Sequence, residues 1–77
     1  HPTELRATLT AAREAFPNRR ILAAFQPHLY SRTRDFAGDF GDALASADLV
    51  FLADIYPARE KPIDGVSSQL IADAMAK

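Results

Sequence analysis

The chain passes from an apolar run into a dense polar loop within one short stretch, Arg20-Ile21-Leu22-Ala23-Ala24-Phe25-Gln26-Pro27-His28-Leu29-Tyr30-Ser31-Arg32-Thr33-Arg34. Residues 21–25 are almost continuously apolar and are bounded by polar residues, as in a strand buried on both faces. Pro27 has no N–H for a sheet ladder and ends the strand. In open α/β sheets, ligands bind in the crevice beyond the carboxyl ends of the strands. This polar loop is therefore the first candidate for a functional site.

Two arginines in the loop break a local rule of helix formation. If Ser31 is the N-cap of the helix that follows, Arg32 and Arg34 lie in its first turn, where the macrodipole disfavours cations. An anionic ligand held by the guanidinium groups and the free N–H groups of the helix would compensate. The alternative is that both arginines point into water or pair with surface acids such as Asp35. The residues alone leave both interpretations open.

The composition limits the classes of protein to which the chain can belong. Its 77 residues make at most one small domain, and it has no cysteine for a disulfide or a thiolate metal site. Nine basic and ten acidic side chains give a formal charge of -1, which argues against non-specific binding to nucleic acid or to a membrane surface. No apolar run is long enough to span a bilayer, and no signal peptide is recognisable. Because the chain begins at His1, we expect it to be a piece of a longer protein.

The periodicity of apolar residues predicts three helices and two strands. The predicted elements are, in order, a helix from Pro2 with His1 as its N-cap, a strand over residues 21–25, a helix from about 32 or 33 to 47, a strand over 49–53, a loop over 56–65 and a helix capped by Ser67 or Ser68. Gly38 and Gly41 weaken the second helix unless close packing requires them. Because a helix joins the strands, we expect the strands to be adjacent and parallel, with a right-handed crossover.

All-parallel sheets occur almost only inside larger folds that cover both faces of the sheet. The fold class is therefore α/β, and we expect part of a Rossmann-like three-layer α/β/α domain with the order α-β-α-β-loop-α and two adjacent parallel strands.

Polar side chains gather where both strands end. Because parallel strands end at the same edge of a sheet, we expect the loops after both strands to line one crevice. The first helix should run antiparallel to its strand, which would bring its start to the same crevice. The candidate side chains are His1, His28, Tyr30, Arg32, Arg34, Asp54, Tyr56, Arg59 and Glu60.

The motifs that the chain lacks limit what these residues can do. There is no G-x-x-x-x-G-K-[ST] or G-x-G-x-x-G loop to cradle a phosphate, no Cys/His nucleophile pair and no H-E-x-x-H. Two histidines and scattered acids do not make a metal site, so we expect no metal ligand here. In the structural interpretation, His28 only forms hydrogen bonds and Asp54 only caps a helix or loop. Tyr30 and Tyr56 are then half-buried packing residues. In the functional interpretation, the loops bind a small anion without being a complete catalytic machine.

Three segments carry a resemblance to a known family. They are His1-Pro2-Thr3-Glu4, Phe25-Gln26-Pro27-His28-Leu29-Tyr30-Ser31-Arg32-Thr33-Arg34 and Asp54-Ile55-Tyr56-Pro57-Ala58-Arg59-Glu60. In this order and spacing they resemble the C-terminal domain of the Mur ligases, in particular of the branch that joins L-alanine to UDP-N-acetylmuramate. The resemblance covers essentially the whole chain. It implies that residues 1–77 are an incomplete C-terminal domain and that the N-terminal and central ATP-binding domains lie outside this chain.

The resemblance implies an ATP-dependent, Mg²⁺-requiring amide ligase of bacterial peptidoglycan synthesis, located in the cytoplasm. In this family the muramoyl carboxylate is activated as an acyl phosphate, which the amine of L-alanine attacks. ATP and Mg²⁺ are bound mainly by the central domain. The implied partners are therefore L-alanine, UDP-N-acetylmuramate, ATP and the rest of the same protein, and residues 1–77 alone are expected to be inactive.

The resemblance also implies roles for single residues. Arg32 matches an arginine expected to face the alanine carboxylate, and His1 matches the second histidine of a Tyr-Gly/Ala-His-His-Pro signature. Leu29 departs from the pattern, because many members carry a second arginine there. The remaining candidates are His28 and Arg34 for substrate binding, and Asp54, Tyr56 and Glu60 for nucleotide or domain-closure contacts.

Two other hypotheses remain open from the sequence. One is a free-standing Rossmann-like module that binds a nucleotide or a small anion without catalysis. The other is a purely structural α/β piece whose polar strand ends only cap and solubilise it.

Overall fold

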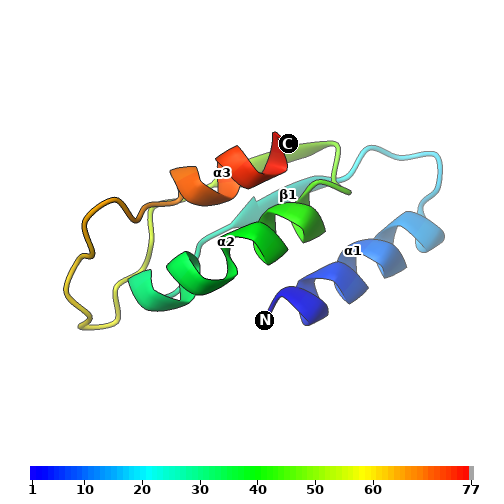
Figure 1. Ribbon diagram of the computed structural model, residues 1–77. Helices are drawn as coiled ribbons and strands as arrows, with labels where there is room; N and C mark the ends of the chain where they lie inside the picture. The colour runs from blue at the N-terminus through cyan, green and yellow to red at the C-terminus, as the bar shows by residue number, and fades with distance from the viewer. Residues whose placement is uncertain (77) are drawn as a thin grey trace.

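A computed structural model describes residues 1–76 and contains two short strands and three helices (Figure 1). Their order is α1 (Pro2–Ala15), β1 (Leu22–Phe25), α2 (Tyr30–Leu44), β2 (Leu49–Leu52) and α3 (Gln69–Met75). The strands pair in parallel, with Leu22 opposite Leu49 and Phe25 opposite Leu52. The predicted α/β class, the order of the elements and the parallel pairing are confirmed.

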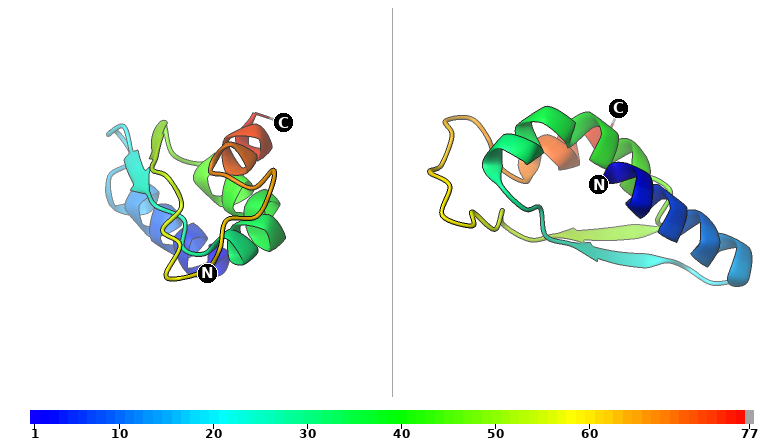
Figure 2. Two further views of the ribbon diagram at one scale, coloured as in Figure 1. Left: turned by 90° about the vertical axis from the view of Figure 1, so that its left-hand side faces the viewer. Right: turned by 90° about the horizontal axis from the view of Figure 1, so that it is seen from below.

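Helix α1 begins as its sequence predicts. The Nδ1 atom of His1 accepts a hydrogen bond from the N–H of Thr3 at 3.2 Å, and Pro2 occupies the first helical position. This position suits proline because its N–H would have no partner inside the helix. The helix runs antiparallel to β1, as Figure 2 shows, and it buries Leu9.

All three helices pack against the same face of the sheet (Figure 2, right). The centre of the core is formed by Phe40 and Leu44 of α2 and Ile71 of α3. Both strands contribute every second residue to this core, since successive side chains of a strand point to opposite faces. The residues of the sheet and of α1 that pack against it include Ala23, Phe25, Val50, Leu52 and Leu5.

The opposite face of the sheet is apolar but open to solvent among the described residues. Leu22, Leu49 and Phe51 are 54%, 47% and 57% exposed. The expectation that the first strand is buried on both faces therefore fails within residues 1–76, because the helices of this part cover only one face. These residues form two layers of the predicted three-layer arrangement.

Helix α2 differs from its prediction at both ends. It begins at Tyr30 with Leu29 as N-cap, whereas the sequence favoured Ser31 as N-cap and a start at residue 32 or 33. The first backbone bond of the helix runs from the N–H of Thr33 to the carbonyl of Leu29 at 3.1 Å, and Ser31, which would cap a later start, donates to the distant Glu60 instead. The helix ends at Leu44 rather than at residue 47, because residues 45–47 form a tight turn in which the N–H of Ala47 donates to Leu44.

Candidate functional site

The loops that follow β1 and β2 are joined at the carboxyl edge of the sheet. The N–H of Tyr56 donates to the carbonyl of Pro27 at 2.8 Å, and the N–H of Leu29 donates to the carbonyl of Tyr56 at 2.8 Å. His28 and Tyr56 thus form one further parallel bridge beyond the strands. The predicted meeting of the two strand ends is confirmed.

The side chains at this bridge also contact each other. The rings of His28 and Tyr56 stack with centroids 5.6 Å apart and planes 15° apart. Both residues are exposed, and Tyr56 remains 54% accessible. The pair presents a flat aromatic surface of the kind that can stack on another planar group.

The start of α2 is occupied by a carboxylate from within the chain. Glu60 accepts the N–H of Ser31 at 2.9 Å through Oε1 and the hydroxyl of Ser31 through Oε2. The bond from the Ser31 hydroxyl, helped by the N–H groups of Ser31 and Tyr30 and by the charge of Arg34, lowers the pKa of Glu60. Partial desolvation opposes this shift. The sequence suggested an anion at this helix start. Within residues 1–76 the carboxylate of Glu60 occupies that place.

The two arginines near the start of α2 differ in their surroundings. Arg34 Nε donates to Asp35 Oδ1 at 2.9 Å, and this bond and the adjacent charge raise the pKa of Arg34. Arg34 thus follows the alternative in which a neighbouring acid pairs with it. Arg32 is exposed and forms no salt bridge with any acid in residues 1–76. Its guanidinium group is available to bind a carboxylate or a phosphate.

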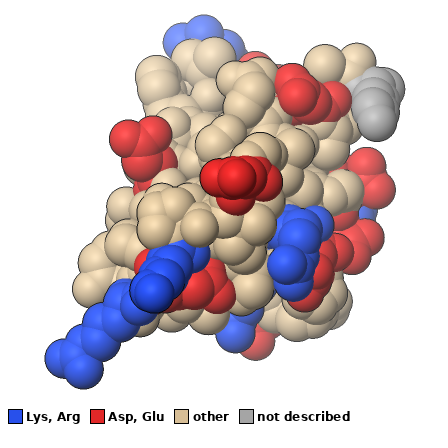
Figure 3. Space-filling model, turned by 60° about the vertical axis from the view of Figure 1, so that its left-hand side comes forward, with Lys and Arg blue, Asp and Glu red and all other residues tan. Residues whose placement is uncertain are grey.

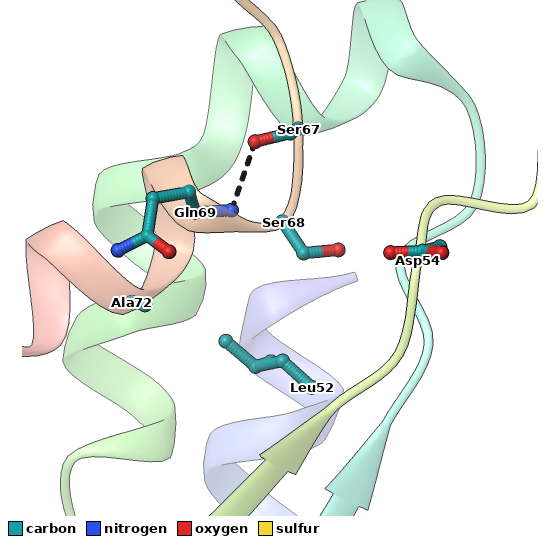
Figure 4. Close-up of a pocket in the computed structure, with 6 residues that line it drawn as sticks. All are labelled: Leu52, Asp54, Ser67, Ser68, Gln69 and Ala72. Carbon is teal, nitrogen blue, oxygen red and sulfur yellow. Dashed lines mark hydrogen bonds between the residues drawn. The ribbon is translucent and has the colours of Figure 1, made fainter.

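An open pocket of about 280 Å³ lies beside the end of β2 (Figure 4). Asp54 stands on its strand side, and the close-up shows Ser67, Ser68 and Gln69 on its helix side. The N–H of Gln69 donates to the Ser67 hydroxyl at 3.1 Å, and the Ser68 hydroxyl donates to the carbonyl of Ala53. A second pocket of about 200 Å³ shares three of these residues and extends to Tyr30.

The sequence predicted Asp54 at this edge but treated the two serines only as helix caps. The sequence did contain a sign of this pocket. Ser67 and Ser68 directly precede the last helix, which must return to the sheet beside β2, so their side chains come close to the end of β2. Neither pocket is lined by His1, His28, Arg32 or Arg34. The two pockets are therefore lined by residues other than the four substrate-binding candidates.

His1 lies close to the body of α2. Its ring centroid is 5.7 Å from that of Phe36, and its Nδ1 atom is engaged by Thr3. No hydrogen bond between His1 and the strand-end loops is found in residues 1–76. The helix direction that placed His1 near the crevice is correct, but the described contacts of His1 are with its own helix and with α2.

The side of the molecule that carries the loop after β2 shows charges of both signs (Figure 3). Lys and Arg side chains lie next to Asp and Glu side chains rather than in one basic field. Among residues 1–76 there is no group of three His, Cys, Asp or Glu side chains placed to hold a metal ion. In the same part of the chain, none of the helices has the length and apolarity needed to cross a membrane.

Comparison with known proteins gives one consistent result. The family model described as "Mur ligase, glutamate ligase domain" matches residues 1–77. The chain is 63% identical to a UDP-N-acetylmuramate--L-alanine ligase of Cutibacterium acnes over 97% of this chain and 16% of that protein. It is 58% identical to proteins of the same name from Christiangramia forsetii, over 99% of this chain and 17% of that protein, and from Pelodictyon phaeoclathratiforme, over 100% and 16%.

The chain thus spans about a sixth of the length of these relatives. Both the family model and the relatives cover practically all of its residues, including both strand-end loops and the start of α2. On this evidence the chain belongs to the Mur ligase family, whose glutamate ligase domain it matches from its first residue to its last.

Proposed function

We propose that this chain is an incomplete C-terminal domain of an ATP-dependent ligase that joins L-alanine to UDP-N-acetylmuramate in bacterial peptidoglycan synthesis. The observation that carries the proposal is the match of nearly the whole chain, at 58–63% identity, to three relatives named for that reaction. The cytoplasm is the proposed location, because the nucleotide-linked substrates of such a reaction are cytoplasmic molecules.

ATP and Mg²⁺ bind mainly to parts of the protein outside this chain. Two features of residues 1–76 support this division: they contain no cluster of potential metal ligands, and the sequence has no glycine-rich phosphate loop. Bound ATP supplies the phosphoryl group that activates the muramoyl carboxylate. The residues of this chain bind and orient the amino acid and close over the nucleotide.

Arg32 binds the carboxylate of L-alanine in this proposal. An arginine can grip a carboxylate with two parallel hydrogen bonds, which fixes the direction of the amino acid and leaves its amine free to attack. The exposure of Arg32 and the lack of an acidic partner within residues 1–76 support this role. His28 and Arg34 are neighbouring substrate contacts, and His1 approaches the substrate from the first helix.

Asp54 and Tyr56 belong to the side of the crevice that faces the nucleotide or a neighbouring domain, and Glu60 follows them in the same loop. The exposed stack of His28 and Tyr56 supports contact with a planar group there. Asp54 lies at the open pocket beside β2.

The test is an assay of the full-length protein. Phosphate release from ATP should require Mg²⁺, L-alanine and UDP-N-acetylmuramate together, and omission of any one should abolish it. D-glutamate in place of L-alanine serves as the control. Turnover that favours D-glutamate, or that proceeds without the UDP-sugar, would overturn the proposed substrates.

A further inference from the structure

The loop after β2 contains backbone angles that residues with side chains rarely adopt. Ala58 and Arg59 have φ angles of 48° and 74°, and the N–H of Glu60 donates to the carbonyl of Pro57 at 2.8 Å. Such turns favour glycine and asparagine, and a residue with a side chain adopts them only at a cost in free energy. A conformation of this cost persists only where surrounding contacts fix it. The contacts that follow this turn are those of the Glu60 carboxylate.

Glu60 supplies the cap that α2 lacks. Leu29, at the N-cap position, has φ 73° and makes no side-chain capping bond, and the first turn contains no acid. The Glu60 carboxylate reaches the helix start from 29 residues away and accepts both the N–H and the hydroxyl of Ser31. It therefore satisfies free groups of the helix start and places a negative charge at the positive end of the dipole.

This cap lies immediately beside the arginine assigned to the amino acid. Ser31 directly precedes Arg32, so the bonds of Glu60 to Ser31 fix the backbone from which Arg32 projects. The negative charge also offsets the positive charges of Arg32 and Arg34 near the helix start, and Glu60 and Arg34 each favour the charged form of the other. Both carboxylate oxygens are already engaged in this way. A direct contact of Glu60 with a nucleotide would have to compete with these bonds.

We propose that Glu60 is a positioning residue, which clamps the loop after β2 onto the first turn of α2 and thereby orients Arg32 toward the carboxylate of the incoming amino acid. This inference rests on the proposed function. It gives Glu60 a role inside the chain in place of the nucleotide contact suggested by its position alone.

The experiment uses full-length enzyme and steady-state kinetics with each substrate varied in turn. Glu60→Ala should raise the KM for L-alanine about tenfold, as expected for the loss of hydrogen bonds to a charged group, and should leave the KM for ATP within about twofold. Glu60→Gln keeps one acceptor for the Ser31 N–H and should show a smaller rise. Ser31→Ala removes the hydroxyl from the other side and should also raise the KM for L-alanine. Asp64→Ala, which changes an exposed acid of the same loop, is the control and should change neither KM.

A double-mutant cycle separates positioning from direct contact. If Glu60 acts through Arg32, then Glu60→Ala should have little further effect on the KM for L-alanine in an Arg32→Ala background. Full additivity, or a rise in the KM for ATP alone, would overturn the inference. If Glu60→Ala does not fold, Glu60→Gln and Ser31→Ala decide by the same criteria.

The cycle also separates this inference from the function on which it depends. An Arg32→Ala enzyme with an unchanged KM for L-alanine would refute the role of Arg32 and the positioning role with it. A raised KM for Arg32→Ala together with normal values for both Glu60 variants would refute only the positioning role.

Discussion

Gly41 of α2 lies directly against Ala74 of α3. A Cβ atom built on Gly41 would lie 2.5 Å from the Cβ of Ala74 and 3.0 Å from both the carbonyl carbon of Ala74 and the nitrogen of Met75. The contact is with backbone as well as with a side chain, so it cannot be relieved by a rotamer change. The absence of a side chain at residue 41 is what allows the two helices to approach so closely.

Gly41→Ala should therefore destabilise the protein, by about 1–3 kcal/mol, as expected for overpacking at a close contact. Gly38→Ala is the matched control, because Gly38 is on the same helix and a Cβ atom there would have no atom of residues 1–76 within 4 Å, apart from its own chain neighbours and helix backbone. That change should stabilise the protein by about 0.5–1 kcal/mol through the better helix propensity of alanine. Urea unfolding of the two variants measures both effects. Equal effects in one direction would contradict the packing explanation.

The order of elements was predictable because each signal is local. The apolar run before Pro27, the helical spacing of apolar residues and the cap at His1 each depend on residues near one another in the chain. The close approach at Gly41 was predicted only as a possibility, since its partner Ala74 is far away in sequence. The sequence shows apolar residues on both faces of the strands, and so few elements can cover such a sheet only in part. Within residues 1–76 the helices cover one face and leave Leu22, Leu49 and Phe51 of the other face exposed.

The cap of α2 shows why local rules fail at the site. Serine is a favoured N-cap residue, yet the hydroxyl of Ser31 donates to Glu60 and the helix begins one residue before Ser31. This arrangement depends on the left-handed turn at Ala58 and Arg59. Neither residue is a glycine or an asparagine, so the sequence gives no local sign of this turn. The candidate residues were thus located correctly by loop, whereas their partners depended on tertiary contacts.

Asp48 forms a second junction, which the sequence did not indicate. Its Oδ2 atom accepts the N–H of Ile21 at 2.6 Å and a bond from Arg13 at 3.2 Å, and Arg13 also donates to the carbonyl of Ser46 at 2.7 Å. The bond from the Ile21 N–H, with help from Arg13 and Arg20, lowers the pKa of Asp48, while desolvation opposes the shift. The junction ties the end of α1 to the starts of both strands.

Asp48→Asn should lower stability at neutral pH and should also change its pH dependence. Because the pKa of Asp48 is lower in the folded state than its ordinary value of 3.8, its contribution is present above that value. The contribution is lost as the pH falls through the lower, folded pKa. The difference in unfolding free energy between wild type and Asp48→Asn should therefore be constant at pH 5–7 and should shrink below about pH 4.

Chemical denaturation from pH 7 to pH 3 measures this difference. Asp42→Asn is the control, because Asp42 is an exposed acid of α2 that forms no salt bridge within residues 1–76. Glu60 titrates in the same direction in both proteins, so the comparison isolates Asp48. A wild-type advantage that grows on acidification would refute the assignment.

The open face of the sheet predicts how residues 1–77 behave as an isolated polypeptide. Exposed apolar side chains on a sheet with two free edges favour association between copies. The isolated chain should therefore self-associate with increasing concentration, and the double change Leu22→Thr and Phe51→Thr should reduce this, since threonine keeps the preference for a strand. Phe16→Thr, which alters a 60% exposed residue outside the sheet, should have little effect. Sedimentation velocity over a concentration series measures the association. Equal association of the unchanged chain, the double variant and Phe16→Thr would show that the open sheet face is not the contact surface.

Arg32 gives the most direct test of the site in the full-length enzyme. Arg32→Ala should raise the KM for L-alanine by about tenfold to a hundredfold, because hydrogen bonds to a charged partner are lost. Arg32→Lys should recover only part of this, since an ammonium group cannot reproduce the paired bonds of a guanidinium group. Arg34→Ala should have a smaller effect because Arg34 is already paired with Asp35, and Arg6→Ala, at an exposed position of α1, should have none. The KM for ATP serves as the internal reference, and an Arg32→Ala enzyme that binds L-alanine normally would remove Arg32 from the substrate site.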